Sequence, residues 1–276
     1  MNRHVRKKVA GICLLCAAVL GQGRADTTLV FGEVAEDGSV SLTQQMHLRE
    51  GAIAIAGDGD GRVFVYNEGK KTAYVVDHGE RKYIAFDPEK VAKMAENFSQ
   101  VQRQFLGGLE SKMADLPAEQ RERLKQVMDQ VHQFSEEQMQ RKGPEVSYRD
   151  TGRTEAVGGF DASVVEVMTG EKRTGLLYMV PYASVGLSAG EYGTLARFQA
   201  FIGDLASKLP AGVRSQFGDF EMLTRSDRIP VQIVRFDESG KPRKTERLAA
   251  RDNKPVEDGW FTVPEGYELQ RLEIGG

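Results

Sequence analysis

The predicted fold is decided by residues 87–142, DPEKVAKMAENFSQVQRQFLGGLESKMADLPAEQRERLKQVMDQVHQFSEEQMQRK. Asp87 is a favourable N-cap, Pro88 suits the first turn of a helix, and Glu89 puts a negative charge at its N-terminal end. Apolar residues then recur at spacings of three and four, and a second such stripe follows Pro117. The two stripes are Val91, Met94, Phe98, Val101, Phe105 and Leu109, and then Leu124, Val127, Met128, Val131 and Phe134. These patterns predict a long helical hairpin over residues 88–142.

The segments on both sides of this hairpin have the pattern of β-strands. Residues 39–49 alternate between apolar and polar side chains, which predicts a strand with one solvated face and therefore an antiparallel sheet. Further short strand signals, separated by turn residues, run through residues 51–86 and 145–182 and resume at residue 229. The sequence therefore predicts an α+β protein: a curved, half-barrel-like antiparallel sheet with the inserted hairpin and one further helix.

The further helix is marked at both ends. Ser188 and Glu191 have the spacing of a capping box, and Pro210 with Gly212 closes the segment. Between them Leu195, Phe198, Ile202, Leu205 and Leu209 form one apolar stripe.

The first 25 residues have the layout of a cleavable signal peptide. Basic residues precede an uncharged run over residues 9–20, and a small-x-small site ends at Ala25. This run is too short to span a bilayer, and no later run is long enough, so we expect no membrane span in the mature chain. Cleavage after Ala25 would place the protein in the periplasm or, alternatively, outside the cell. The mature chain, 26–276, is then one α+β domain with a β meander (26–87), the hairpin (88–142) and a second β portion with a helix (143–276).

The charge of the mature chain argues against nucleic acid as a partner. Removing residues 1–25 takes away five of the 37 Lys and Arg residues and none of the 40 Asp and Glu residues, which leaves 32 against 40 and a formal net charge of −8. Nucleic acids and anionic membrane surfaces both require clustered positive charge. Both cysteines, Cys13 and Cys16, lie within the leader. The mature chain is therefore expected to have no disulfide.

No recognised catalytic or metal motif emerges. Residues 186–190, GLSAG, match the G-x-S-x-G nucleophile elbow, but no histidine follows His132, so Ser188 is interpreted as a helix cap. The mature histidines, His47, His78 and His132, are isolated, so neither a metal site nor a cofactor is expected. A hydrolase that uses a pair of carboxylates stays open, because acidic residues are abundant.

Three short motifs resemble an exported bacterial family, the domain of unknown function 4412. They are Lys82-Tyr83-Ile84-Ala85-Phe86-Asp87, Thr151-Gly152 followed by Val157-x-Gly159-Phe160, and Phe261-x-Val263-Pro264-x-Gly266-Tyr267. That family in turn is similar to the LolA/LolB type of periplasmic lipoprotein carrier. The resemblance implies a curved antiparallel sheet wrapped around helices, with an apolar cavity between them.

The functional prediction is a non-enzymatic periplasmic carrier that holds a lipid or a lipidated peptide between sheet and helices. Soft side chains on the hairpin are expected to line the groove, although the default explanation for such side chains is ordinary core packing against the sheet. The expected lining residues are Met94, Phe98, Val101, Phe105, Leu124, Met128, Val131 and Phe134.

The alternative is a chaperone-like or regulatory envelope protein that binds an unfolded partner through the hairpin. Residues 116–121, LPAEQR, are similar to the Leu-Thr-x-x-Gln-Arg signature of the Spy/CpxP class of periplasmic chaperones. Pro117 departs from that signature, and it is also explained as the first residue of the second helix.

We expect the exported protein to begin at Asp26. Intact-mass measurement of the chain recovered from a periplasmic extract should show the loss of residues 1–25. Replacing Ala25 by Phe should block processing, because the cleavage site requires small side chains. A full-length chain that remains in the membrane pellet would contradict the predicted cleavage.

Overall fold

The computed structural model describes residues 26–57, 59, 61–93, 100, 108, 117, 122, 125, 146–208 and 224–270. Its strands are β1 (Thr27–Val34), β2 (Val40–Arg49), β3 (Ala52–Gly57), β4 (Arg62–Asn67), β5 (Thr72–Asp77), β6 (Lys82–Phe86), β7 (Val146–Val157), β8 (Phe160–Thr169), β9 (Lys172–Pro181), β10 (Arg228–Phe236), β11 (Pro242–Asp252) and β12 (Glu268–Leu269). The helices are α3 (Ala189–Ser207) and two short 3-10 turns, η1 (Tyr182–Val185) and η3 (Asp258–Phe261). Residues 88–93 form a further helical turn.

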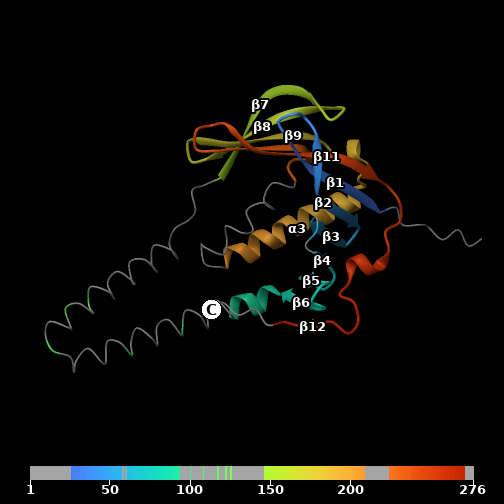
Figure 1. The fold of residues 1–276 in the computed structure, drawn as a ribbon, viewed down its shortest axis with the longest axis vertical. Helices are drawn as coiled ribbons and strands as arrows, with labels where there is room; N and C mark the ends of the chain where they lie inside the picture. The colour runs from blue at the N-terminus through green and yellow to red at the C-terminus, as the bar shows by residue number, and fades with distance from the viewer. Residues whose placement is uncertain are drawn as a thin grey trace, which may run out of the picture.

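All twelve strands belong to one sheet, in the order β12-β6-β5-β4-β3-β2-β1-β11-β10-β9-β8-β7 (Figure 1). Neighbouring strands are antiparallel, except that β12 runs parallel to β6. The first strand lies in the middle, where β1 pairs with β2 on one side and with β11 on the other. This central pairing joins the strands before and after the predicted hairpin into one surface.

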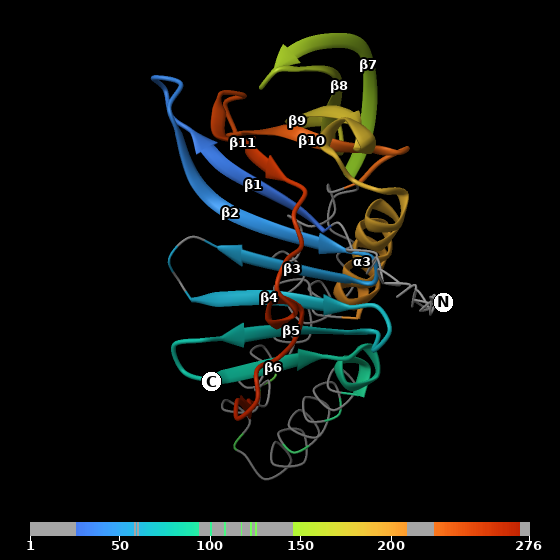
Figure 2. The same ribbon diagram turned by 90° about the vertical axis from the view of Figure 1, so that its right-hand side faces the viewer.

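The two faces of the sheet are covered by different parts of the chain. Helix α3 lies across one face, which we call the α3 face (Figure 1). Residues 253–267, which we call the C-terminal strap, cross strands β3 to β6 on the opposite face before the chain reaches β12 (Figure 2). Strands β3 and β4 are therefore buried from both sides.

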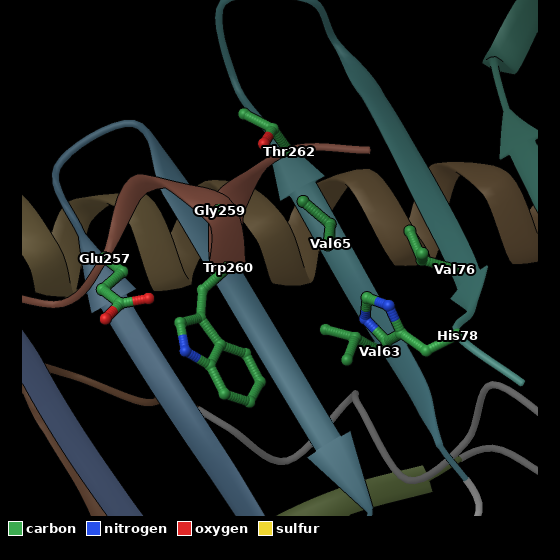
Figure 3. Close-up of a pocket in the computed structure, with 8 residues that line it drawn as sticks. All are labelled: Val63, Val65, Val76, His78, Glu257, Gly259, Trp260 and Thr262. Carbon is green, nitrogen blue, oxygen red and sulfur yellow. The ribbon is translucent and has the colours of Figure 1, made fainter. Parts of the chain in front are cut away.

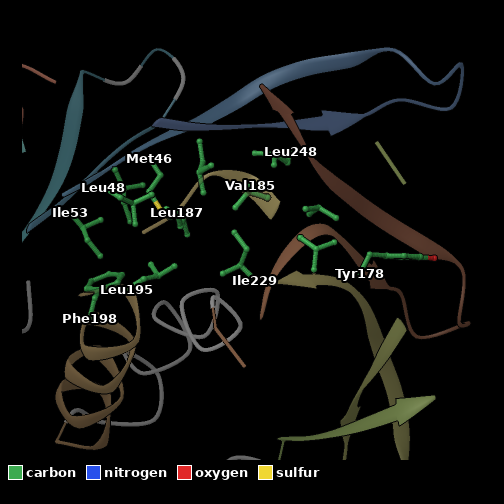
Figure 4. Packing of buried hydrophobic residues seen from close by; sticks show 14 of the residues in the cluster. Met46, Leu48, Ile53, Tyr178, Val185, Leu187, Leu195, Phe198, Ile229 and Leu248 are labelled. Carbon is green, nitrogen blue, oxygen red and sulfur yellow. The ribbon is translucent and has the colours of Figure 1, made fainter. Parts of the chain in front are cut away.

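The start of α3 confirms the predicted capping box. The Glu191 amide donates to Ser188 Oγ at 3.2 Å, and the Ser188 amide donates to Glu191 Oε2 at 2.8 Å. The apolar stripe of the helix is buried in the main core, where Phe198 lies 5.5 Å from Phe64 and 5.3 Å from Tyr66 between ring centroids (Figure 4). Helix and sheet thus bury their apolar faces against each other.

Strand β3 shows how one short sequence serves both faces. Ile53 and Ile55 belong to the main core on the α3 face, whereas Ala52 and Ala54 belong to a smaller cluster with Phe261 of the strap. Successive side chains of a strand point to opposite faces. The alanines lie on the face that the strap covers, and their small side chains leave room for it there.

The prediction of an α+β fold organised by a helical hairpin is wrong. Most described residues belong to the twelve-stranded mixed sheet, which is open, with β12 and β7 at its edges. At the predicted start, Asp87 does cap a helical turn, with its Oδ1 accepting from the Glu89 and Lys90 amides at 2.9 and 3.2 Å. Beyond residue 93 the hairpin lies outside the described residues, apart from five isolated positions. The prediction gave more weight to the strong helical periodicity of residues 87–142 than to the many short strand signals. The pairing of β1 with a distant strand leaves no pattern in the local sequence that could have predicted it.

Phe198→Ala should lower the free energy of unfolding by about 3–5 kcal/mol, because it removes a fully buried ring from the main core. Leu42→Ala is the matched control, since Leu42 is 55% exposed and its truncation should change stability by no more than about 0.5 kcal/mol. Urea unfolding measures both. Equal losses in the two variants would contradict the central role given to Phe198.

Candidate functional site

One concavity lies on the α3 face, between α3 and the edge strand β7. Its volume is about 380 Å³. The lining side chains are mostly apolar or small: Val146, Tyr148, Ala196, Gln199, Ala200, Gly203 and Thr224. No charged side chain is among these described lining residues. We call this space the α3–β7 groove.

The polar groups of the groove already bond to one another. Gln199 Oε1 accepts from the Thr224 amide at 2.9 Å and from the Thr224 hydroxyl at 2.7 Å. The Arg225 guanidinium lies over the Tyr148 ring, 5.2 Å from its centroid. At Gly203 a Cβ atom would meet no described atom within 4 Å, so the helix surface is open there. Gln199 and Thr224 thus already have hydrogen-bond partners, and the surface that the groove offers to a ligand is mainly apolar.

A second concavity, of about 200 Å³, lies beneath the C-terminal strap. Valines of β4 and β5 form its floor, and the Trp260 indole and the His78 imidazole project into it from different sides (Figure 3). The complete lining is Val63, Val65, Val76, His78, Glu257, Gly259, Trp260 and Thr262. We call this cavity the strap pocket.

A buried ion pair fastens the strap to the sheet. The Asp26 carboxylate is fully buried, accepts from Arg49 Nε at 2.9 Å and Nη2 at 2.8 Å, and also accepts from the Val256 amide at 2.8 Å. Arg49 donates in addition to the Val256 carbonyl and to Asp258, and its guanidinium lies over the Phe261 ring. The hydrogen bond to Asp26 raises the pKa of Arg49 above its already high ordinary value. We call Asp26, Arg49, Val256 and Asp258 the clasp.

His47 packs beside the clasp, between the sheet and the strap. Its Nδ1 lies 2.9 Å from the Thr28 hydroxyl, and its ring centroid lies 4.4 Å from that of Trp260. Its Nε2 is buried without a hydrogen-bond partner in the described part of the chain. Burial lowers the pKa of His47, and the charge of Asp26 opposes that shift only in part. The His47 imidazole is therefore uncharged, and it packs against the Trp260 indole.

Comparison with known proteins assigns no family. No protein-family model matches the chain, and no curated protein matches it. Among solved structures the chain is similar to an uncharacterized conserved protein from Thermus thermophilus, with 8% sequence identity and a TM-score of 0.40 over 90% of this chain and 91% of that one. A likeness this distant supports no statement on fold or function. The resemblance to the domain of unknown function 4412 and to LolA/LolB carriers stays a prediction.

All eight residues expected to line an apolar groove lie outside the described residues. They are Met94, Phe98, Val101, Phe105, Leu124, Met128, Val131 and Phe134. The lining residues that the structure describes for the two concavities come from other parts of the chain. The signals that the sequence did offer for the strap pocket were the closing aromatic motif and Trp260, the only tryptophan of the chain.

Ser188 acts as a helix cap rather than as a nucleophile. Its hydroxyl and amide bond to Glu191, whereas the two described histidines contact Thr28 and Tyr267. Within the described ranges, no group of three or more His, Cys, Asp or Glu side chains is placed to hold a metal ion. In the same ranges, no helix has the length and apolar character needed to cross a membrane.

The pKa values of six described carboxyl groups are shifted by their surroundings. The pKa is lowered in each of Asp37, Asp77, Glu166, Asp237, Glu246 and Asp252. In Glu166 the causes are hydrogen bonds from Arg149 and Arg173, and in Asp237 the cause is first of all the Ser239 hydroxyl. A general acid needs the opposite shift, because its pKa must approach the working pH. These carboxylates are ordinary partners of basic groups and turns.

The free energy of unfolding should fall between pH 7.5 and 5.5 because of His47. Its pKa is lower in the folded than in the unfolded chain, where it is about 6.5. As the pH falls through that value, His47 binds a proton in the unfolded chain but not in the folded chain, so the free energy of unfolding decreases. Urea unfolding at both pH values should show a smaller fall in His47→Gln than in the wild type. An identical pH dependence in the two proteins would contradict a neutral, buried His47.

Proposed function

We propose that this protein is an exported, non-enzymatic binding protein that holds an apolar ligand, either a lipid or a lipidated peptide, on the α3 face of its sheet. The observation that carries the proposal is the α3–β7 groove, about 380 Å³ of space whose described lining residues carry no charge. Binding sites for small apolar molecules are concave, mostly apolar and equipped with few polar groups.

The lining chemistry favours an acyl chain over a polar ligand. Gln199 and Thr224 already bond to each other, so a polar ligand would have to break those bonds without an evident replacement. An acyl chain contributes about 0.8 kcal/mol for each buried methylene. Micromolar binding corresponds to about 8.2 kcal/mol, so it requires burial of roughly ten methylenes. The expected ligand is therefore a long chain that enters beside the open surface at Gly203.

The edge position of the groove gives such a chain a route of entry. One wall is β7, an edge strand of the sheet, and Val146 at its start is 41% exposed. The other wall is the side of α3 that flanks the buried stripe of Leu195, Phe198 and Ile202. A ligand can thus occupy the groove without disturbing the main core.

Ala200→Phe tests the proposal. Ala200 is exposed and lines the groove, so a benzyl group there should displace at least two methylenes of the ligand and weaken binding at least about tenfold. Titration with dansyl-labelled undecanoic acid, followed by dansyl emission, measures the affinity.

Ala189→Phe is the matched control, because Ala189 is exposed at the start of the same helix and does not line the groove. It should bind the probe as the wild type does. Native mass spectrometry of the wild type taken from the periplasm should in addition show a bound mass that the Ala200→Phe protein lacks. Failure of the wild type to take up the probe, or equal uptake by all three proteins, would refute the proposal.

A further inference from the structure

The strap pocket lies on the opposite face of the sheet from the α3–β7 groove and shares no lining residue with it. Its volume of about 200 Å³ exceeds the cavity of about 150 Å³ that is known to accept benzene. Val63, Val65 and Val76 give it an apolar floor (Figure 3). The pocket is therefore large enough for a small organic group.

The charge at this pocket is negative. Glu257 lies on its rim and makes no ion pair with any residue that the structure describes. Two cations lie near the strap, and neither is among the described lining residues: Arg49 is shared by Asp26 and Asp258, and Arg81 lies over the Tyr267 ring. Since Glu257 is the one acidic side chain of the described lining and no Lys or Arg side chain is part of it, the pocket favours a cation over an anion.

The aromatic wall is held in place by the protein itself. The Trp260 amide donates to the Glu257 carbonyl at 3.1 Å, and the side chains of both residues line the pocket. His47 packs against the indole at 4.4 Å, and the clasp anchors the turn at Asp258. A tryptophan ring attracts cations through its quadrupole, more strongly when water is excluded. Because these contacts already fix the indole, a ligand that binds there pays little conformational entropy for ordering it.

We propose that the strap pocket is a binding site for a small organic cation that carries methyl or methylene groups, such as a quaternary or alkyl ammonium. The valine floor contacts the apolar groups of the ligand. The Trp260 indole attracts the positively charged ammonium group with its methyl or methylene substituents, and the Glu257 carboxylate balances the charge. This site is separate from the proposed apolar carrier function and does not depend on it.

Trp260 makes the test direct, because the chain contains no other tryptophan. Choline and its neutral isostere 3,3-dimethylbutanol are titrated into the full mature chain while tryptophan emission is recorded. Choline should produce a saturable change. The alcohol has the same shape without the charge, and we expect it to bind at least about fivefold more weakly.

Glu257→Gln should weaken choline binding roughly 5- to 30-fold and leave the alcohol unaffected, because it removes the charge and keeps the shape. Glu265→Gln is the matched control: it removes one exposed acid from the same strap, outside the pocket lining, and should bind choline as the wild type does. Both positions are exposed, so both variants should fold, and urea unfolding checks this.

Equal affinities for choline and the alcohol would overturn the proposal in favour of a merely apolar pocket. Equal losses in Glu257→Gln and Glu265→Gln would overturn it in favour of a general charge effect. The absence of any saturable change with choline would overturn it outright. None of these results bears on the α3–β7 groove, whose test uses a different probe and different variants.

Discussion

The pairing of β1 with β11 is the contact on which the rest of this structure depends. Residues 27–34 lie between β2, which follows at once in the sequence, and β11, which comes more than two hundred residues later. Without this strand the sheet would divide into two separate meanders. Both ladders shift register at Phe31, and a Cβ atom at Gly32 would lie 2.7 Å from the Ser41 carbonyl oxygen. A glycine is needed there because a Cβ atom would clash with Val40 and Ser41 beside the interruption of the ladders.

The strap and its pocket are consequences of the same pairing. Because β11 ends beside the beginning of β1, the chain leaves the sheet next to Asp26 and Thr27. Asn253 there donates to the Thr27 hydroxyl at 2.9 Å and to the Gly186 carbonyl at 2.8 Å. The clasp follows three residues later and directs the strap over β3 and β4. A buried carboxylate such as Asp26 is tolerable only with a well-placed cation and further hydrogen bonds, and Arg49 with the Val256 amide supplies them.

The sequence predicted local structure far better than it predicted the organisation of the fold. Strand signals were expected through residues 51–86, where β3 to β6 lie, and the Ser188–Glu191 capping box located the start of α3. The predicted fold class was wrong because it was based on residues 87–142, which have the strongest periodicity of the chain. The described fold is instead organised by strand pairing. Strand pairing depends on contacts between segments that are distant in the sequence. The residue pattern of β1 predicts a strand, but it does not predict that β11 is its partner. The clasp likewise joins Asp26, Arg49 and Asp258 across most of the chain.

The two concavities differ in ways that follow from what covers each face. A helix leaves a groove wherever its side chains are small, and Ala196, Ala200 and Gly203 are small on the side of α3 that faces β7. An extended strap cannot cover a sheet evenly, so it leaves a hollow between its anchors, here between the clasp and the His78–Tyr267 contact. The first space is apolar because a helix satisfies its own backbone polar groups. The second has a charged rim because a strap exposes its backbone and side chains to water. The same sheet thus presents an apolar groove on one face and an acidic, aromatic pocket on the other, and the described lining residues of the two spaces do not overlap.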